Sequence, residues 1–298
     1  TVAGCTTEKI VFRDREPFNV PQTAALGFLG YYAVSTQQTT CGNCHSEKQA
    51  RWATTKHSEA WEDLQASGHA VAACNGCHTV SERGNSVGAP AGYSVVPDSV
   101  YHDVQCENCH GPGLTHVQNP TRNNIPLASI AVVDGTINGC AGCHTGVHNP
   151  FADQWKQSGH GSGPGFDRAA TNASCQPCHE GKGALAAKFG VVTNYIEASS
   201  TTPRRIVCAV CHDPHGSNHD KMLVSQQPWL CQRCHLTIQG KVVLDQAYLH
   251  IHSNWFLPYV GGYYAATVLG LTTITRDEVL ADLPRFLAAG QPHLADYY

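Results

Sequence analysis

Fourteen of the fifteen cysteines in this 298-residue chain fall into seven copies of one pattern, Cys-x-x-Cys-His. The copies are Cys41-Cys44-His45, Cys74-Cys77-His78, Cys106-Cys109-His110, Cys140-Cys143-His144, Cys175-Cys178-His179, Cys208-Cys211-His212 and Cys231-Cys234-His235. Their first cysteines are separated by 33, 32, 34, 35, 33 and 23 residues. A nearly constant period indicates a repeated structural unit. The fold must therefore accommodate seven such units, numbered here as sites 1 to 7.

This pattern is the attachment sequence of c-type haem. The two thiols bond covalently to the vinyl groups of the porphyrin, and the adjacent histidine becomes the proximal iron ligand. Zinc also binds Cys and His, but zinc gives no reason for a histidine after the second cysteine in all seven copies. A disulfide framework would not need the histidines either. We therefore predict seven haem c groups, with the histidine of each motif as proximal ligand.

Seven haems in 298 residues leave about 43 residues for each. A haem is a large apolar disc, so the haems should form most of the core. The 28 glycines and 16 prolines argue against long regular elements. The expected fold is mostly irregular coil with short α-helices wrapped around a haem chain, and little β-structure. We expect an extended N-terminal segment (1–40), a heptahaem-binding region (41–240) and a haem-free packing or interface segment (241–298).

Eleven histidines lie outside the motifs, and a second axial histidine at every iron would use seven of them. Methionine could serve at most one haem, because Met222 is the only one. We predict five distal ligands: His57, His69, His116, His160 and His215. Four others compete for the two remaining positions: His148, His252, His250 and His102. His219 and His293 are expected to be ordinary surface histidines.

The contexts of these histidines recur along the chain. Trp52 precedes His57 at the same W-x4-H spacing as Trp155 precedes His160, each time after a motif. His215 lies in the sequence HDPHG, in which proline stiffens the chain and Gly216 permits close approach to a porphyrin. The short final interval predicts that sites 6 and 7 are close in space.

The combination of C-x-x-C-H…W…S-G-H, CENCHGPG…H and C-x-x-C-H-D-P-H-G resembles multihaem cytochromes. It is similar to the tetrahaem carriers of nitrifiers, the octahaem hydroxylamine-oxidoreductase group and the extracellular cytochromes that polymerise into conductive filaments. The resemblance spans residues 40–240. It implies distal roles for His57, His116, His160 and His215, and haems in alternating parallel and T-shaped pairs. All seven motifs keep histidine, and the spare histidines outnumber the distal positions. Both features disfavour the enzymes of this group, because those need an open iron position.

The two ends of the chain contain no motif. Residues 251–275 carry no Asp, Glu, Lys or Arg and are long enough to span a bilayer. Their Pro258, Gly261 and polar residues instead favour a packing segment or a subunit interface. A capped helix is predicted from Thr275 to Gly290. Cys5 follows Val-Ala-Gly, which resembles a bacterial lipobox; lipidation there would attach the protein to a membrane, and a free thiol or a Cys5–Cys5 contact is the alternative.

The predicted function is electron transfer, with no substrate bound at iron. The formal charge is −4, with no Lys/Arg-rich run, so nucleic acid is not an expected partner. The haem propionates would add about −14 and the ferric centres about +7, so the oxidised protein would carry a net charge of about −11. Haem is attached outside the cytoplasm, so we expect an extracellular or cell-surface protein, with the periplasm second. Partners would be redox proteins or an extracellular acceptor, and further copies of the chain in an end-to-end filament. A monomeric electron shuttle and an oxidoreductase of nitrogen or sulfur oxyanions are the alternatives.

Overall fold

The computed structural model describes residues 25–132, 138–146, 149–197, 203–225, 230 and 233–234. The α-helices in this part are α1 (Ser46–Trp52), α2 (Ala60–Ala66), α3 (Ala72–His78), α4 (Cys106–His110), α5 (Leu114–Gln118), α6 (Phe151–Gln157), α7 (Gly159–Ser162), α8 (Pro164–Ala169), α9 (Gln176–His179), α10 (Gly181–Phe189) and α11 (Cys208–Cys211). The 3-10 helices are η1 (Val34–Thr36), η2 (Cys41–Asn43), η3 (Lys56–Glu59), η4 (Ser99–Tyr101), η5 (Cys140–Gly142), η6 (Thr193–Tyr195) and η7 (Asp220–Met222).

The strands within this part of the chain are β1 (Tyr31–Ala33) and β2 (Gln38–Thr39), which pair antiparallel. Tyr31 lies opposite Thr39 and Ala33 opposite Gln38, with an irregular register between them. Gln37, at φ 50°, makes the left-handed turn that brings the chain back from η1. The predicted fold class, irregular coil with short helices and little β-structure, is confirmed.

Glycine and proline lie at the ends of some of these short helices. The nine-residue α10 ends at Gly190, whose φ of 67° is the left-handed conformation that glycine favours after a helix. Proline occupies the first turn of α8, where its missing N–H costs no hydrogen bond. Helices of this length are not stable alone and depend on packing.

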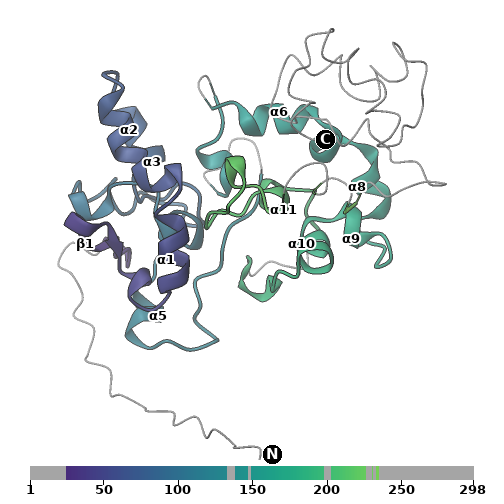
Figure 1. Cartoon of the computed structure of the whole chain (residues 1–298), viewed down its shortest axis with the longest axis horizontal. Helices are drawn as coiled ribbons and strands as arrows, with labels where there is room; N and C mark the ends of the chain where they lie inside the picture. The colour runs from purple at the N-terminus through teal and green to yellow at the C-terminus, as the bar shows by residue number, and fades with distance from the viewer. Residues whose placement is uncertain are drawn as a thin grey trace, which may run out of the picture.

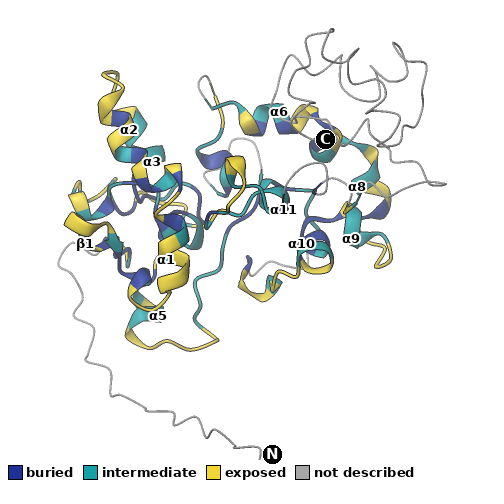
Figure 2. Ribbon diagram, viewed as in Figure 1, coloured by how far each residue is buried: buried dark blue, intermediate teal, exposed yellow. Residues whose placement is uncertain are grey.

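Figure 1 shows two groups of elements, with α1 to α5 and β1 on one side and α6 to α11 on the other. Each group has a small apolar cluster. One contains Ala25, Phe28, Val80, Ala91 and Tyr101, and the other contains Ile130, Ala184, Leu185, Ile196, Val207 and Val210. Buried residues form short scattered stretches rather than one central block (Figure 2). Protein side chains alone therefore supply little continuous core.

Glu107, within the site 3 motif, is hydrogen-bonded to the segment that precedes site 1. This fully buried carboxylate accepts hydrogen bonds from the backbone N–H groups of Leu29, Gly30 and Gly113 at 2.8–2.9 Å. Burial raises the pKa of Glu107 to about 7, although these three donors lower it. Residues 25–40 thus pack against the haem-binding region. The domain divisions at residues 40 and 240 stay predictions, as do the calls on the chain ends, which lie outside the described residues.

Candidate functional site: the haem attachment motifs and their histidines

Sites 1 to 6 are each folded as a single helical turn. The backbone N–H of the motif histidine donates to the carbonyl of the first cysteine at 2.9–3.0 Å in sites 1, 4, 5 and 6. Residues at positions i, i+3 and i+4 lie on one face of such a turn. The two thiols and the imidazole are therefore presented together. The cysteines of sites 2, 3, 4 and 5 are not in disulfides, so both thiols of each pair are present to form thioethers.

Backbone carbonyls orient several motif histidines. The Nδ1–H groups of His78, His110 and His212 donate to the carbonyl oxygens of Ala60, Pro126 and Lys221 at 2.7, 2.9 and 2.7 Å. A histidine that ligates metal characteristically donates its other ring N–H to such an acceptor. In this arrangement the protein binds Nδ1, and Nε2 is the nitrogen that would ligate an iron.

Burial keeps the imidazoles in the neutral form that ligates metal. It lowers the pKa of His144 to about 4, with help from the nearby His57 and His212. It also lowers the pKa values of His57, His110 and His212. The Nδ1 atom of His144 is buried without a hydrogen-bond partner. His144 therefore lacks the Nδ1 acceptor that His78, His110 and His212 have, and its Nε2 would be the atom that binds iron.

Two motif histidines face histidines from distant parts of the chain. The ring centres of His57 and His144 are 6.0 Å apart, and those of His110 and His215 are 6.2 Å apart. Two imidazoles on opposite sides of one metal ion have ring centres about 6 Å apart, since each metal–nitrogen bond is about 2 Å. Both spacings fit axial ligation of a single iron, at site 4 and at site 3.

The other predicted distal ligands lie in varied surroundings. His69 is exposed, His160 lies in α7, and the Nδ1 atom of His116 is 3.2 Å from Oδ1 of Asn124. His102 stacks on Trp61 with ring centres 3.9 Å apart. The competing candidates His148, His250 and His252 lie outside the described residues, and so does His293; His219 is exposed.

Cysteines of different motifs touch one another in a regular order. The thiol of Cys41 contacts that of Cys106, and the thiol of Cys140 contacts that of Cys208. A third contact joins Cys77 and Cys143, and in the thiol form it lowers the pKa of Cys77 to about 6. These contacts link site 1 to site 3, site 4 to site 6, and site 2 to site 4. Sites 1, 2 and 4 thus each contact the site that follows the next one in sequence.

Site 7 continues this order where it is described. The Cys234 sulfur lies 4.0 Å from the carbonyl oxygen of Pro177, which lies between the two cysteines of site 5. Cys231 and His235 lie outside the described residues. The expected closeness of sites 6 and 7 therefore stays a prediction.

Two tryptophans repeat the same contact. The indole N–H of Trp52 donates to the carbonyl of Val104 at 2.9 Å, and that of Trp155 donates to the carbonyl of Ile206 at 2.8 Å. Each acceptor lies two residues before a motif, at site 3 and site 6 respectively. The shared W-x4-H spacing therefore reflects a structural repeat, in which the site 1–site 3 arrangement recurs as site 4–site 6.

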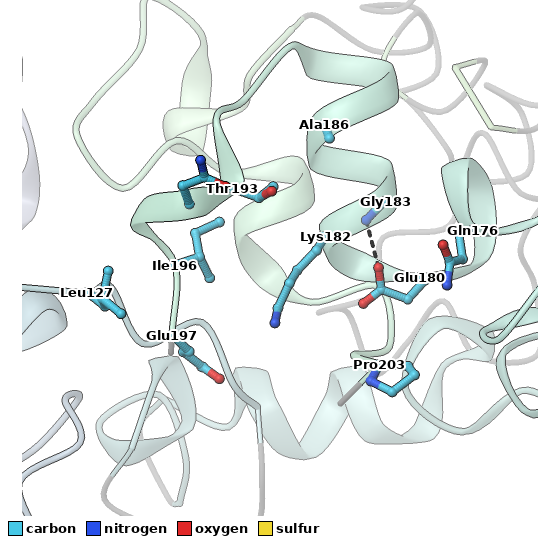
Figure 3. Close-up of a pocket in the computed structure, with 11 residues that line it drawn as sticks. Leu127, Gln176, Glu180, Lys182, Gly183, Ala186, Thr193, Ile196, Glu197 and Pro203 are labelled. Carbon is cyan, nitrogen blue, oxygen red and sulfur yellow. Dashed lines mark hydrogen bonds between the residues drawn. The ribbon is translucent and has the colours of Figure 1, made fainter. Parts of the chain in front are cut away.

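A cavity of about 570 Å³ lies beside site 5, a volume in the usual range for cofactor sites. Its lining includes Gln176 of the motif, and Lys182, which extends from α10 into the space near Glu197 and Glu180 (Figure 3). The Lys182 Nζ atom is buried without a hydrogen-bond partner, and burial lowers the pKa of Lys182. The ammonium group fits a haem propionate. Haem c therefore fits the cysteines and histidines of the motifs, and it also fits the unpaired Lys182 ammonium group.

Several residues near the sites carry no obvious signal in the sequence. Asp213 receives a hydrogen bond from the Nδ1–H of His215 at 3.1 Å, and Arg51 binds the same carboxylate. Asn124 contacts His116, and Lys182 lines the cavity beside site 5, only in the folded chain. Only Asp213 could have been suspected, because it stands between two histidines in HDPHG.

In the described residues, no three or more His, Cys, Asp or Glu side chains gather as ligands for a bare metal ion. None of the helices described there combines the length and apolarity that a membrane crossing requires. The uncharged run 251–275 lies outside that part of the chain.

Two family models match segments of the chain. The model described as Cytochrome c554 and c-prime matches residues 40–111, which hold sites 1 to 3. The model described as Doubled CXXCH motif matches residues 203–239, which hold sites 6 and 7. No curated protein and no solved structure matches the chain. The two matches support a multihaem c-type cytochrome, in which haem c carries electrons.

Proposed function

We propose that this chain transfers electrons through seven covalently attached haem c groups, most of them ligated by two histidines. When bound, haem c supplies an iron that changes between the ferric and ferrous states. The observation that carries the proposal is the spacing of two ring pairs, His57 with His144 and His110 with His215. With a histidine on each side, such an iron has no open position for a substrate. This favours an electron carrier over an oxyanion oxidoreductase.

Histidines of this chain are also the proposed axial ligands of the other irons. His45, His78, His110, His144, His179, His212 and His235 are the proposed proximal ligands, and His57, His69, His116, His160 and His215 the proposed distal ones. His102, His148, His250 and His252 compete for the last two positions. The thiol contacts between motifs support a closely spaced array, because sulfurs that touch would hold the edges of neighbouring porphyrins near each other.

The proposed location is extracellular or at the cell surface. Haem is attached outside the cytoplasm, and electrons could pass from there to an extracellular acceptor. End-to-end association of copies would extend the array into a filament. Apolar surface near site 1 supports such a contact, since Leu26 and Tyr32 are 63% and 68% exposed. A non-closing head-to-tail contact of this kind generates a filament. A discrete electron shuttle in the periplasm or at the outer surface is the alternative.

A haem count and an optical spectrum test the proposed electron-transfer function. A pyridine haemochrome assay should find seven haems in each polypeptide, and the oxidised spectrum should be low-spin and insensitive to nitrite or hydroxylamine. A high-spin component that responds to either compound would favour the oxidoreductase.

Negative-stain microscopy tests the proposed assembly. Filaments at high protein concentration are expected, whereas discrete particles alone would favour the shuttle. The haem count does not depend on this result.

A further inference from the structure

His215 differs from His78, His110, His116 and His212 in the acceptor of its Nδ1–H group. The Nδ1 partners of His78, His110 and His212 are backbone carbonyls, and that of His116 is the neutral amide oxygen of Asn124. The partner of His215 is a carboxylate, since Oδ1 of Asp213 lies 3.1 Å from Nδ1. The same oxygen accepts the backbone N–H of His215 at 3.0 Å.

The carboxylate is held in place from both sides. Oδ2 of Asp213 accepts a hydrogen bond from Arg51 at 2.6 Å, and the Asp213 backbone N–H donates to the carbonyl of Met222 at 2.8 Å. Arg51 also donates to the carbonyl of Gly216. The Asp213 side chain is only 23% exposed, so solvent screens these contacts weakly.

Glycine is required where the two segments meet. Gly216 has a φ of 99°, and a Cβ there would lie 2.6 Å from the backbone oxygen of Arg51. This close approach brings the helix that follows site 1 against the loop that follows site 6. The orientation of His215 therefore depends on a contact between distant parts of the chain.

We propose that Asp213 is a positioning residue that directs Nε2 of His215 toward the iron shared with His110 and lowers the reduction potential of that iron. The inference rests on the proposed haem ligation. A carboxylate that accepts the Nδ1–H makes the imidazole more basic and a stronger donor to iron. Stronger donation stabilises the ferric state, so the potential falls. Arg51 neutralises part of the carboxylate charge and limits this effect.

Asp213→Asn in the haem-loaded full chain tests the inference. Asparagine retains an acceptor oxygen but lacks the negative charge. In a potentiometric titration followed by haem absorbance, one component should move to a higher potential while the others stay in place. The haem count and the low-spin spectrum should not change. The matched control is Asp220→Asn, which removes the same charge from an exposed position at the start of η7 and should leave that component where it is.

A second variant, Arg51→Gln, should shift the same reduction potential in the opposite direction. Loss of the guanidinium leaves the Asp213 charge uncompensated, so the same component should move to a lower potential. The inference is overturned if either variant retains its haems and leaves every component unmoved, or if all components move equally. If Asp213→Asn fails to fold, Arg51→Gln decides by the same criterion. A wild-type protein with too few haems would instead contradict the proposed function itself.

Discussion

The imidazole rings of His57 and His144 lie with their centres 6.0 Å apart, although one is in η3 after site 1 and the other belongs to site 4. Burial lowers the pKa values of both, so both are neutral at pH 7. A shared iron would connect these two segments more strongly than the small apolar clusters can. The structure thus predicts which iron each of these histidines serves.

Replacement of His57 should leave one iron with a vacant coordination position. In His57→Ala the iron at site 4 loses its second axial ligand, so one of seven haems should become high-spin. The oxidised absorbance and EPR spectra measure this change. His219→Ala is the control, since His219 is exposed and should leave every haem low-spin. A fully low-spin His57→Ala protein would contradict the assignment.

Removal of both thiols at one site should remove one haem. The double variant Cys106→Ala and Cys109→Ala should bind six haems instead of seven, as measured by the mass of the intact protein and by the haemochrome assay. Cys5→Ser should still bind seven, because Cys5 is outside the motifs. An unchanged haem count in the double variant would show that site 3 is not an attachment site.

The two tryptophan contacts should contribute equally to stability. Trp52→Phe and Trp155→Phe each remove an indole donor and leave a carbonyl unpaired, which should cost about 1 kcal/mol. Thermal unfolding should show similar decreases for both variants. Tyr195→Phe, at a 45% exposed position, is the control and should change little. Clearly unequal losses would argue against a structural repeat.

Glu107 should make stability depend on pH. Its pKa is about 7 in the folded protein and ordinarily 4.5, so between these values the folded state retains a proton that the unfolded state releases. The contribution of Glu107 to the unfolding free energy should therefore be fully present below pH 4.5 and fall by about 3 kcal/mol as pH rises through 7. Between pH 4.5 and 7.5, the unfolding free energy of Glu107→Gln should decrease less with rising pH than that of the wild-type protein. Equal slopes would mean that Glu107 is ionised throughout.

The backbone donors around Glu107 provide a separate test. Glu107→Ala leaves the N–H groups of Leu29, Gly30 and Gly113 without their acceptor, and each buried unpaired donor costs about 1–3 kcal/mol. Chemical denaturation should therefore show a large loss of stability. The exposed Glu62 supplies the control, since Glu62→Ala should be nearly neutral.

The sequence by itself determined the local chemistry of the motifs. Two cysteines three positions apart, followed by a histidine, lie on one face wherever the backbone makes a helical turn, so motif geometry needs no distant contact. The prediction of short helices in irregular coil held for the same reason, because glycine and proline act on their immediate neighbours. The shared W-x4-H spacing likewise indicated that Trp52 and Trp155 occupy equivalent positions, and their contacts are equivalent.

Only the tertiary structure decided which distant residues meet. Three features depend on the path of the chain between the residues that meet. They are the pairing of His57 with His144, the contact of Arg51 with Asp213, and the thiol contacts of sites 1, 2 and 4 with sites 3, 4 and 6. Many different paths keep the same motifs, and the physical reason for the observed one lies in buried contacts such as those of Glu107. Local spacing constrains a single turn, whereas the choice of partner depends on how all the turns pack together.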